Sequence, residues 1–433
     1  MKQRSEKRNE GVALILTLLF VVLLTVLVVE FAYEAQVEAS YSMNSGNDYQ
    51  ARLAARSAVY KGISILEAAR LQAELAASQG TGTPTSTSAN NNNNANQNSG
   101  VQVDSRLSAW AQPGTFEPLN DAVMRATITD EFGKINLNAL VVNDNGTRII
   151  REHIRFGLQE FFRLRGEAAG AEVDPEALVE SIIDWIDEDD EAEQGGAEAD
   201  FYLASENPYN AKNGPMDSID ELLLIKGMTT DLYFGAKGLD TPQLPLSEFL
   251  TVHGDWLGRI NPNTVYIEYE TGLCDVLAAM SVGWTECPEP LVAEVRYEDM
   301  VQDMLNAEDD TSAFQSVNDI GGYVTHVALD APDENRPRNQ NQSQSQAQQD
   351  RARQEVLRHM FTVYSHVFRI YGDALLDEIM VRNEVYVLRV PQDQSVMEWP
   401  SDNDTLPFTN PIPDMQRAIP TEFYRILEWK VIQ

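Results

Sequence analysis

The sequence predicts an α+β fold in which a long N-terminal transmembrane α-helix leads into an antiparallel sheet, interrupted by a large inserted all-α domain. Three observations predict it: an uncharged apolar run near the N-terminus, β-rich segments at both ends of the remaining chain, and a helical pattern between them. The 433 residues are enough for two or three domains. We therefore expect one sheet to be assembled from two parts of the chain that lie far apart in sequence.

The N-terminal apolar run is long enough to cross a bilayer. Eighteen residues from Val12 to Val29 carry no charge, and about 20 residues of helix span the hydrocarbon core. We expect a membrane-spanning segment over 12–33, within one helix that continues to residue 77 because strong helix formers follow the run. Basic residues before the run predict a cytoplasmic N-terminus: Lys2, Arg4, Lys7 and Arg8. The pseudopilin resemblance described below implies a single pass through the inner membrane and a periplasmic C-terminal domain.

A secretory signal peptide and a plain membrane anchor are the competing interpretations of this run. A signal peptide would end in small residues and then a break, whereas residues 30–39 continue the helical pattern. Hydropathy alone is equally compatible with a plain anchor. The pair Gly11-Val12, after a short basic leader, resembles a type IV prepilin peptidase site. The resemblance implies that prepilin peptidase removes residues 1–11 and leaves the helix attached, as in pilins and pseudopilins, which pack such helices into a filament core.

Leu16 occupies the fifth position after the expected cleavage site, where pilin-like proteins generally carry glutamate. A carboxylate there offsets the N-terminal amine of the subunit ahead, inside a low-dielectric core where an unpaired charge is costly. A subunit with no neighbour ahead has no amine to neutralise. Leu16 therefore indicates a position at the filament tip, and the resemblance is to the K-type minor pseudopilin of type II secretion, the member that lacks this glutamate.

The rest of the chain divides by composition and periodicity. Two polar low-complexity tracts cannot bury enough apolar surface to fold and separate the structured parts. Strand patterns are predicted over 121–141, 367–376, 379–390 and 422–432. The predicted division is a leader (1–11), the long helix (12–77), a low-complexity loop (78–100), a first α/β part (101–146), an α-helical insert (147–331), a polar linker (332–352) and a second α/β part (353–433).

Motifs in a fixed order resemble the K-type pseudopilin family, general secretion pathway protein K. They are EFGKINLNAL at 131–140, a segment at 178–228 that contains DWID, GAE and PY, and INPNT at 260–264. The resemblance implies a pilin-like fold and a structural, non-enzymatic role at the pseudopilus tip. The implied partners are the I- and J-type minor pseudopilins, the major pseudopilin, and a secreted substrate or the outer-membrane channel.

The segment after 184-DWID-187 is crowded with carboxylates, which repel one another unless a cation lies between them. Counted from Asp187, acids occupy positions 1, 3, 5 and 12 of a twelve-residue loop, as in an EF-hand. Ala192, however, stands sixth, where an EF-hand needs glycine. We therefore expect a divalent-cation site of another geometry, with a merely solvated acidic loop as the alternative.

The family resemblance implies that this cation is structural calcium. We predict Asp187, Asp189 and Glu198 as its ligands. The weaker candidates are Asp184, Asp190, Asp200 and Asn213.

Composition narrows the functional classes further. The formal charge of −35 argues against nucleic acid as a partner. No P-loop, dinucleotide-binding glycine motif, HExxH or GxSxG motif occurs. Cys274 and Cys287 could form a disulfide in an oxidising periplasm, and the sequence leaves both states open. A minor pilin of a type IV pilus and a membrane-anchored, metal-dependent periplasmic enzyme are the rival functions.

Overall fold

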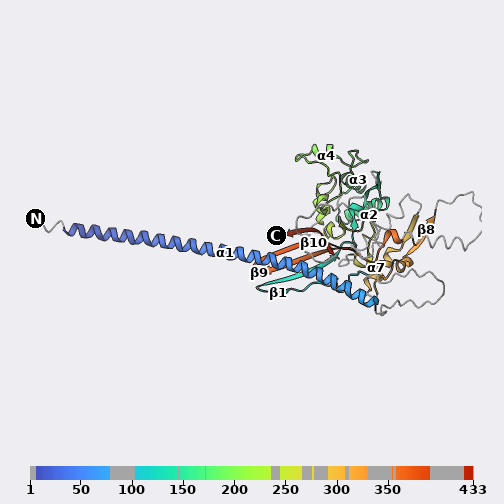
Figure 1. The fold of residues 1–433 in the computed structure, drawn as a ribbon. Helices are drawn as coiled ribbons and strands as arrows, with labels where there is room; N and C mark the ends of the chain where they lie inside the picture. The colour runs from blue at the N-terminus through green and yellow to red at the C-terminus, as the bar shows by residue number, and fades with distance from the viewer. Residues whose placement is uncertain are drawn as a thin grey trace, which may run out of the picture.

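The protein consists of a long helix, a five-stranded antiparallel sheet at the end of that helix, and an insert of helices and short strands (Figure 1). This confirms the predicted α+β fold class. The computed structural model describes residues 6–78, 103–144, 147–170, 172–235, 244–265, 276, 291–307, 312–329, 354, 357–390 and 424–432. Cys274, Cys287 and nearly all of the two polar tracts at 78–100 and 332–352 lie outside the described residues.

The N-terminal helix α1 runs from Glu6 to Ser78 and confirms the long helix predicted for 12–77. At about 1.5 Å per residue, its 73 residues extend roughly 110 Å. Its first part stands clear of the rest of the molecule (Figure 1), and no part of its apolar window is buried. Within the described residues, α1 is the helix long and apolar enough to cross a membrane.

The C-terminal part of α1 packs closely against the sheet because its contact face carries small residues. Ala51, Ala55 and Ala58 are completely buried. A Cβ at Gly372 of the sheet would lie 2.4 Å from the carbonyl oxygen of Ala55, so this approach requires glycine. Further along the helix, larger side chains form a core with the sheet: Val59, Ile63 and Leu66 with Phe368, Ile370 and Val385.

The sheet has the strand order β1–β2–β9–β10–β11, and each neighbouring pair is antiparallel. Two parts of the chain build it, as expected from the sequence. The strands predicted over 367–376, 379–390 and 422–432 are confirmed as β9, β10 and β11. The bounds are Glu117–Leu119 for β1, Ala122–Asp130 for β2, Val367–Leu376 for β9, Ile379–Arg389 for β10 and Tyr424–Ile432 for β11.

The insert leaves and rejoins the sheet at neighbouring positions. Asp130, the last residue of β2, pairs with Phe368 near the start of β9. The insert thus begins directly after β2, earlier than the predicted start at residue 147, and reaches β9, beyond the predicted end at residue 331. The boundaries differ because the short strands that follow β2 pair with other parts of the insert and not with the main sheet.

The insert is helical in large part but, contrary to the prediction, not all-α. Its helices are α2 (Glu152–Ala169), α3 (Pro175–Ile186), α4 (Ala199–Leu203), α5 (Thr230–Phe234), α7 (Tyr297–Leu305) and α8 (Val317–Ile320). Its strand pairs are β3 (Ile135–Asn136) with β6 (Leu250–Thr251), β4 (Val141–Asp144) with β5 (Thr147–Ile150), and β7 (Leu291–Val295) with β8 (Val324–Leu329). Such short strands carry too little alternation to be recognised from sequence.

The insert contains the same structural motif twice. The pattern Asp-x-x-Gly-(Lys/Arg)-Ile-Asn-x-Asn occurs at 130–138 and again at 255–263. In both copies the side chain of the first asparagine accepts the N–H of the second at 3.1 Å, which caps a short 3-10 helix. We call residues 130–254 the first unit and residues 255–366 the second unit.

The second asparagine of each motif fixes a distant segment of its own unit. Asn138 donates to the carbonyl oxygen of Met216 and accepts from its N–H, and Asn263 does the same with Phe314. Two residues beyond each of these partners, a serine starts a capping box: Ser218 with Glu221, and Ser316 with Asp319. The repeated hydrogen bonds show that the two units share one architecture.

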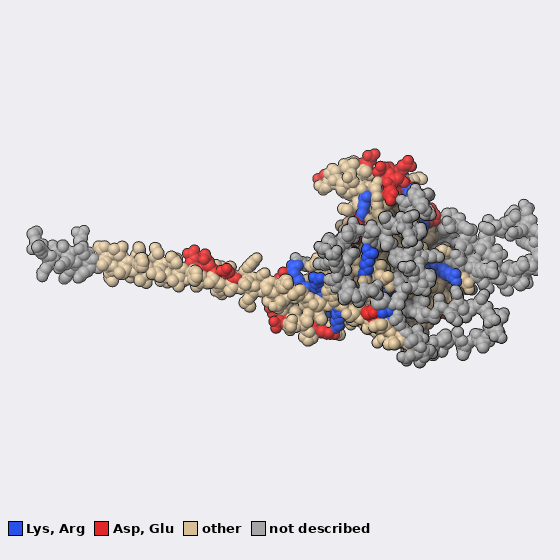
Figure 2. Space-filling view, viewed as in Figure 1, with Lys and Arg blue, Asp and Glu red and all other residues tan. Residues whose placement is uncertain are grey.

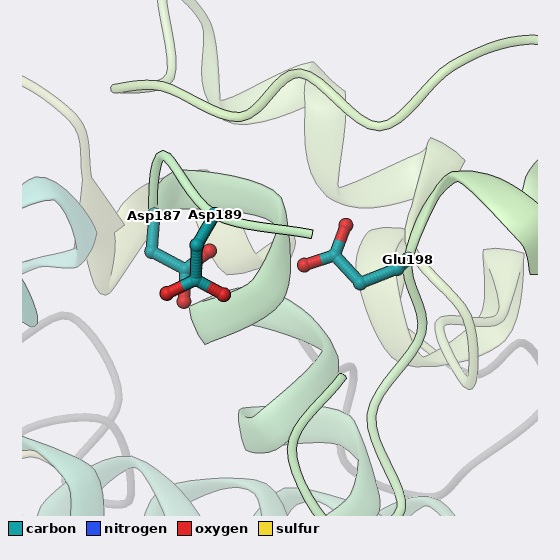
Figure 3. Close-up of side chains that lie close together, drawn as sticks. All are labelled: Asp187, Asp189 and Glu198. Carbon is teal, nitrogen blue, oxygen red and sulfur yellow. The ribbon is translucent and has the colours of Figure 1, made fainter. Parts of the chain in front are cut away.

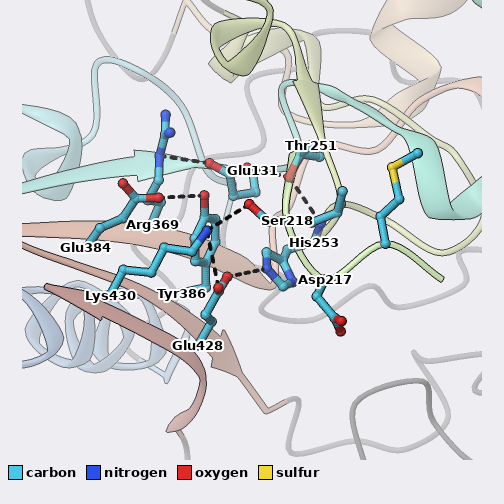
Figure 4. A network of polar contacts seen from close by, with 12 residues as sticks. Glu131, Asp217, Ser218, Thr251, His253, Arg369, Glu384, Tyr386, Glu428 and Lys430 are labelled. Carbon is cyan, nitrogen blue, oxygen red and sulfur yellow. Dashed lines mark hydrogen bonds and ion pairs between the residues drawn. The ribbon is translucent and has the colours of Figure 1, made fainter. Parts of the chain in front are cut away.

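Polar contacts join the first unit to the outer face of the sheet (Figure 4). Glu131, directly after β2, lies 3.2 Å from the Arg369 guanidinium of β9. His253 Nε2 lies 3.0 Å from the Glu428 carboxylate of β11. Two further contacts of this network link Thr251 to Glu131 and Lys430 to Ser218. The sheet therefore holds the first unit, and with it the candidate site, in a fixed position.

Candidate metal centre

Helix α3 positions the acidic segment. The Asp174 side chain accepts the N–H of Ala177 at 3.1 Å, and Pro175 takes the first helical position, where its missing N–H costs nothing. The helix is fixed by a buried apolar face that includes Leu178, Val179, Ile182, Ile183 and Ile186. It ends at Ile186, and the backbone is extended at Asp187. The chain therefore turns back across the end of α3.

Three predicted ligands meet at this turn. Asp187, Asp189 and Glu198 each offer a carboxylate oxygen, and these atoms lie within 4.8 Å of one another. Asp187 and Asp189 approach from the end of α3, whereas Glu198 faces them from the residue before α4 (Figure 3). Asp187 and Glu198 are buried, and Asp189 is exposed. The site thus opens to solvent on one side.

Several carboxylate oxygens at this turn have no hydrogen-bond partner among the described residues. They are both oxygens of Glu198, Oδ1 of Asp187 and Oδ2 of Asp184. Burial raises the pKa of Glu198 to about 7 and that of Asp187 to about 6. The neighbouring carboxylates Asp184 and Asp187 raise the pKa of Glu198 further. The fold therefore places unpaired acid oxygens where their ionised form is unfavourable without a cation.

The end of α3 adds to this demand for positive charge. Its last carbonyl groups carry the negative end of the helix dipole, so a cation near the C-terminus is stabilising and an anion is not. Asp184 and Asp187 nevertheless lie in the last turn and at the C-cap. The acidic side chains gather over α3 and α4, on the part of the insert farthest from α1 (Figure 2). The helix dipole and the unpaired carboxylate oxygens therefore both favour binding of a cation.

Arg148 of β5 is a contributor that the sequence did not reveal. Its Nη1 lies 2.5 Å from Asp187 and 3.2 Å from Asp189, and its Nη2 lies 2.5 Å from Glu193. It offsets part of the negative charge but leaves Glu198 without a partner. In the sequence, Arg148 is a single arginine in a short strand, and no local pattern relates it to the acidic loop.

The weaker candidates separate into supporting and remote residues. Asp184 Oδ1 accepts the N–H of Glu193 at 3.0 Å, and its carboxylate packs against Gly196, where a Cβ would lie 2.0 Å from Oδ2. Asn213 donates to Asp190 at 3.0 Å and to the Asp189 carbonyl at 2.9 Å. Asp200 is exposed in the first turn of α4, and it is not one of the three converging acids.

The donor set fits a hard divalent cation. The three converging groups are carboxylates, and oxygen ligands in a flexible arrangement suit calcium, which takes six to eight of them at about 2.3–2.6 Å. Asp187, Asp189 and Glu198 would hold the ion, while Asp184, Arg148 and Asn213 shape the loop around it. Such an ion would neutralise the loop and tie the end of α3 to the start of α4.

The residues predicted for processing and for the tip position all lie in α1. Gly11 and Val12 lie within its first turns, so no break in the helix marks the predicted cleavage site. The side chains of Val12 and Leu16 are exposed. Leu16 lies in the apolar stretch that the rest of the molecule does not cover.

Comparison with known proteins identifies the segment that carries the site. A family model described as type II secretion system protein K matches residues 133–236. This part of the chain is similar to the type II secretion system protein K family. It includes α3, the three converging acids and Arg148.

Individual protein K sequences are similar to 29% of this chain. It is 33% identical over 124 residues to the type II secretion system protein K of Klebsiella pneumoniae. It is 32% identical over 126 residues to that of Pectobacterium carotovorum subsp. carotovorum. These matches include 29% of this chain and 37% and 38% of the two relatives, so they span little more than a third of each relative.

A solved structure extends the likeness to the whole fold. The match is to a chain in the crystal structure of the GspK–GspI–GspJ complex from the type 2 secretion system of enterotoxigenic Escherichia coli. The TM-score is 0.51 at 17% identity, with 90% of this chain and 99% of that chain covered. At this identity the match shows the fold alone: a pilin-like helix and sheet with an inserted domain.

Proposed function

We propose that this chain is a minor pseudopilin of type II secretion, a non-enzymatic component at the tip of a periplasmic pseudopilus. The observation that carries the proposal is the combination in one chain of a segment that matches protein K and a helix whose apolar half is left uncovered by the described residues. A bare apolar helix is costly in water, and a membrane or a bundle of similar helices would cover it. In the proposed function, the helix lies first in the membrane and then moves into the bundle of pseudopilin helices.

Two features support a position at the tip. The insert projects sideways from the sheet (Figure 1), where it would obstruct the lateral packing of a subunit within the filament. Leu16 provides no carboxylate for the amine of a subunit ahead. By analogy with the matched complex, the I- and J-type minor pseudopilins would be its neighbours, with the major pseudopilin below. A secreted substrate or the outer-membrane channel would be the contact above.

Processing at Gly11 tests the proposal. Intact mass and N-terminal sequence of the membrane-extracted protein should begin at Val12, which prepilin peptidase would also methylate. Gly11→Leu should leave the leader attached, because the peptidase site is lost. Gly46→Leu is the matched control, since a Cβ at Gly46 of the same helix meets nothing within 4 Å. A native chain that is untrimmed, or cut beyond residue 29, would contradict the pseudopilin assignment.

We also propose that calcium binds the three converging acids. The unpaired oxygens of Glu198 and Asp187 support this, and affinity should rise with pH up to about 7 because both acids must be ionised to bind. Isothermal titration of the full chain in detergent should show calcium binding, with a loss of at least tenfold in Glu198→Gln. Asp200→Asn, at the exposed neighbouring acid, should bind as the unaltered chain does. Equal affinity in all three would exclude this site.

A further inference from the structure

Two buried cations at the junction of the sheet and the insert share one buried carboxylate. Arg369 of β9 is 4% exposed, and Lys134 of the first motif is 5% exposed. Arg369 Nε lies 3.2 Å from the Glu131 carboxylate (Figure 4), and Lys134 Nζ lies 2.8 Å from the same group. Burying an uncompensated charge is costly, so one carboxylate between two cations leaves a positive charge for a further anion to neutralise.

A cavity of about 200 Å³ lies beside these cations, and a third cation, Arg106, lines it as well. Arg106 donates to the carbonyl oxygen of Met304, and within the described part of the chain no carboxylate pairs with it. Burial lowers its pKa, as expected for a cation without an acid beside it. The wall also contains Glu248, which lies 3.7 Å from Nη2 of Arg369, beyond hydrogen-bond distance. Three cations thus face the carboxylates of Glu131 and Glu248, which leaves one positive charge in excess.

Asp130, the other acid that lines the cavity, does not remove this excess below neutral pH. Burial raises its pKa to about 7, although hydrogen bonds from the hydroxyl groups of Ser365 and Thr264 oppose the shift. At pH 6 most of the Asp130 side chains are therefore protonated and neutral. The cavity is thus locally positive in a chain whose formal charge is −35.

The rest of the wall supplies apolar surface and a spare donor. Ala111, Ile128 and Val265 are among the lining residues. The indole N–H of Trp110, also in the wall, is buried and has no hydrogen-bond partner among the described residues. Guanidinium groups bind carboxylates through paired hydrogen bonds, and a cavity below the roughly 300–1,000 Å³ of a drug-sized site takes a smaller ligand. One excess charge and an apolar wall together favour a small monocarboxylate over a phosphate or a sulfate.

We propose that this cavity between β2, β9 and residues 106–111 binds a monocarboxylate with a short apolar stem. The carboxylate would lie between Arg106 and Arg369, with its stem against Trp110. Two sources share this chemistry: a free carboxylic acid of a few carbon atoms and the C-terminal carboxylate of a partner polypeptide. The site uses neither the acidic turn nor the apolar half of α1, so it does not rest on the proposed function.

Binding of butyrate to the full chain in detergent at pH 6 tests the proposal. Saturation-transfer NMR should show saturable binding with a Kd on the order of 1 mM, as expected for a ligand of this size. Butyramide, which has the same shape without the charge, should bind at least tenfold more weakly. Equal binding of butyrate and butyramide, or tighter binding of inorganic phosphate than of butyrate, would overturn the proposal.

A second pair of ligands distinguishes the two sources. N-acetyl-alanyl-alanine presents a peptide C-terminal carboxylate, and its C-terminal amide is the uncharged control. A lower Kd for this acid than for butyrate would support a polypeptide C-terminus as the ligand, whereas a higher Kd would support a free carboxylic acid.

A variant locates the bound carboxylate. Arg106→Gln should weaken butyrate binding at least tenfold, and because Arg106 is half-buried the fold should persist, which the thermal unfolding midpoint checks. Arg163→Gln, at an exposed arginine of α2, is the matched control and should bind as the unaltered chain does. On the unaltered chain, the diazirine carboxylate 4,4-azipentanoate should photocrosslink to peptides that contain Trp110 or Ile128, and butyrate should compete. Unchanged binding in Arg106→Gln, or crosslinks confined to other segments, would refute the site.

Discussion

The two units of the insert share one motif but differ in the side chains and contacts that surround it. The first encloses its own tryptophan, lies against the sheet and carries the acidic turn. The second repeats the capping box and the pair of hydrogen bonds from the motif's second asparagine to a distant backbone, which we call the asparagine clamp (Asn138 in the first unit, Asn263 in the second). A hollow lies beside them. The hydrogen bonds of Asn138 and Asn263 are the same in both units, whereas the side chains around them differ. The acidic turn of the first unit lies, in sequence, between Asn138 and its capping box at Ser218.

Removing the tryptophan of the first unit should produce the largest effect. Trp185→Ala would leave a cavity in a buried core and remove the donor to Glu221, which we expect to lower the free energy of unfolding by about 3–5 kcal/mol. Chemical denaturation of the unaltered and variant chains measures this. Trp256→Ala, at a half-buried position of the second unit's motif, is the control and should cost less. Equal costs would show that Trp185 is not central to the first unit.

The first acids of the two motifs should differ in their pH dependence. Burial raises the pKa of Asp130 to about 7, although three hydrogen bonds to it oppose the shift, whereas Asp255 pairs with Arg259 at 2.6 Å. Between pH 4 and 7 the folded state retains the Asp130 proton and the unfolded state loses it. Stability should therefore fall as pH rises through this range, by up to about 3 kcal/mol.

Asp130→Asn should make the slope shallower by the share that Asp130 contributes, because the amide cannot ionise, while the raised pKa values of Asp187 and Glu198 maintain the rest of the slope. Denaturant titrations at pH 4, 5.5 and 7 measure it. Asp255→Asn is the matched variant: it should destabilise the chain by leaving Arg259 without its carboxylate, and it should preserve the slope between pH 4 and 7. An unchanged slope in Asp130→Asn would show that another group carries the titration.

The asparagine clamps should differ least. Asn138 bonds the N–H and carbonyl of Met216 and also the carbonyl of Val252, whereas Asn263 bonds the N–H and carbonyl of Phe314. Each substitution by alanine leaves these backbone groups unpaired. We expect Asn138→Ala to cost about 1 kcal/mol more than Asn263→Ala, the value of one additional hydrogen bond. A larger cost at Asn263, measured by thermal unfolding, would reverse this ranking.

The sequence predicted best what depends on local pattern. The length of α1 and the strands β9 to β11 followed from hydropathy and alternation. The choice of Asp187, Asp189 and Glu198, which the structure brings together, came from the family resemblance. The start of the insert was missed because register with a distant strand, seen in the pairing of Asp130 with Phe368, has no local signal. Arg148 was missed for the same reason.

The internal repeat could have been found from the sequence. EFGKINLNAL and INPNT were recognised as separate motifs, and aligning the two segments would have revealed two copies. The hollow beside α7 and α8 could not have been predicted, because it depends on how side chains from distant segments pack. That information exists only in the packed structure.

The junction between β2 and β9 has a consequence for how such a chain can diversify. Because the insert starts and finishes on strands that already pair, its length has no influence on their register, and doubling a loop adds only about 0.6 kcal/mol of closure entropy. The helix and sheet can therefore accept inserted domains of very different size between β2 and β9. An engineered version could carry a binding domain of another origin there, with the helix and sheet left as they are.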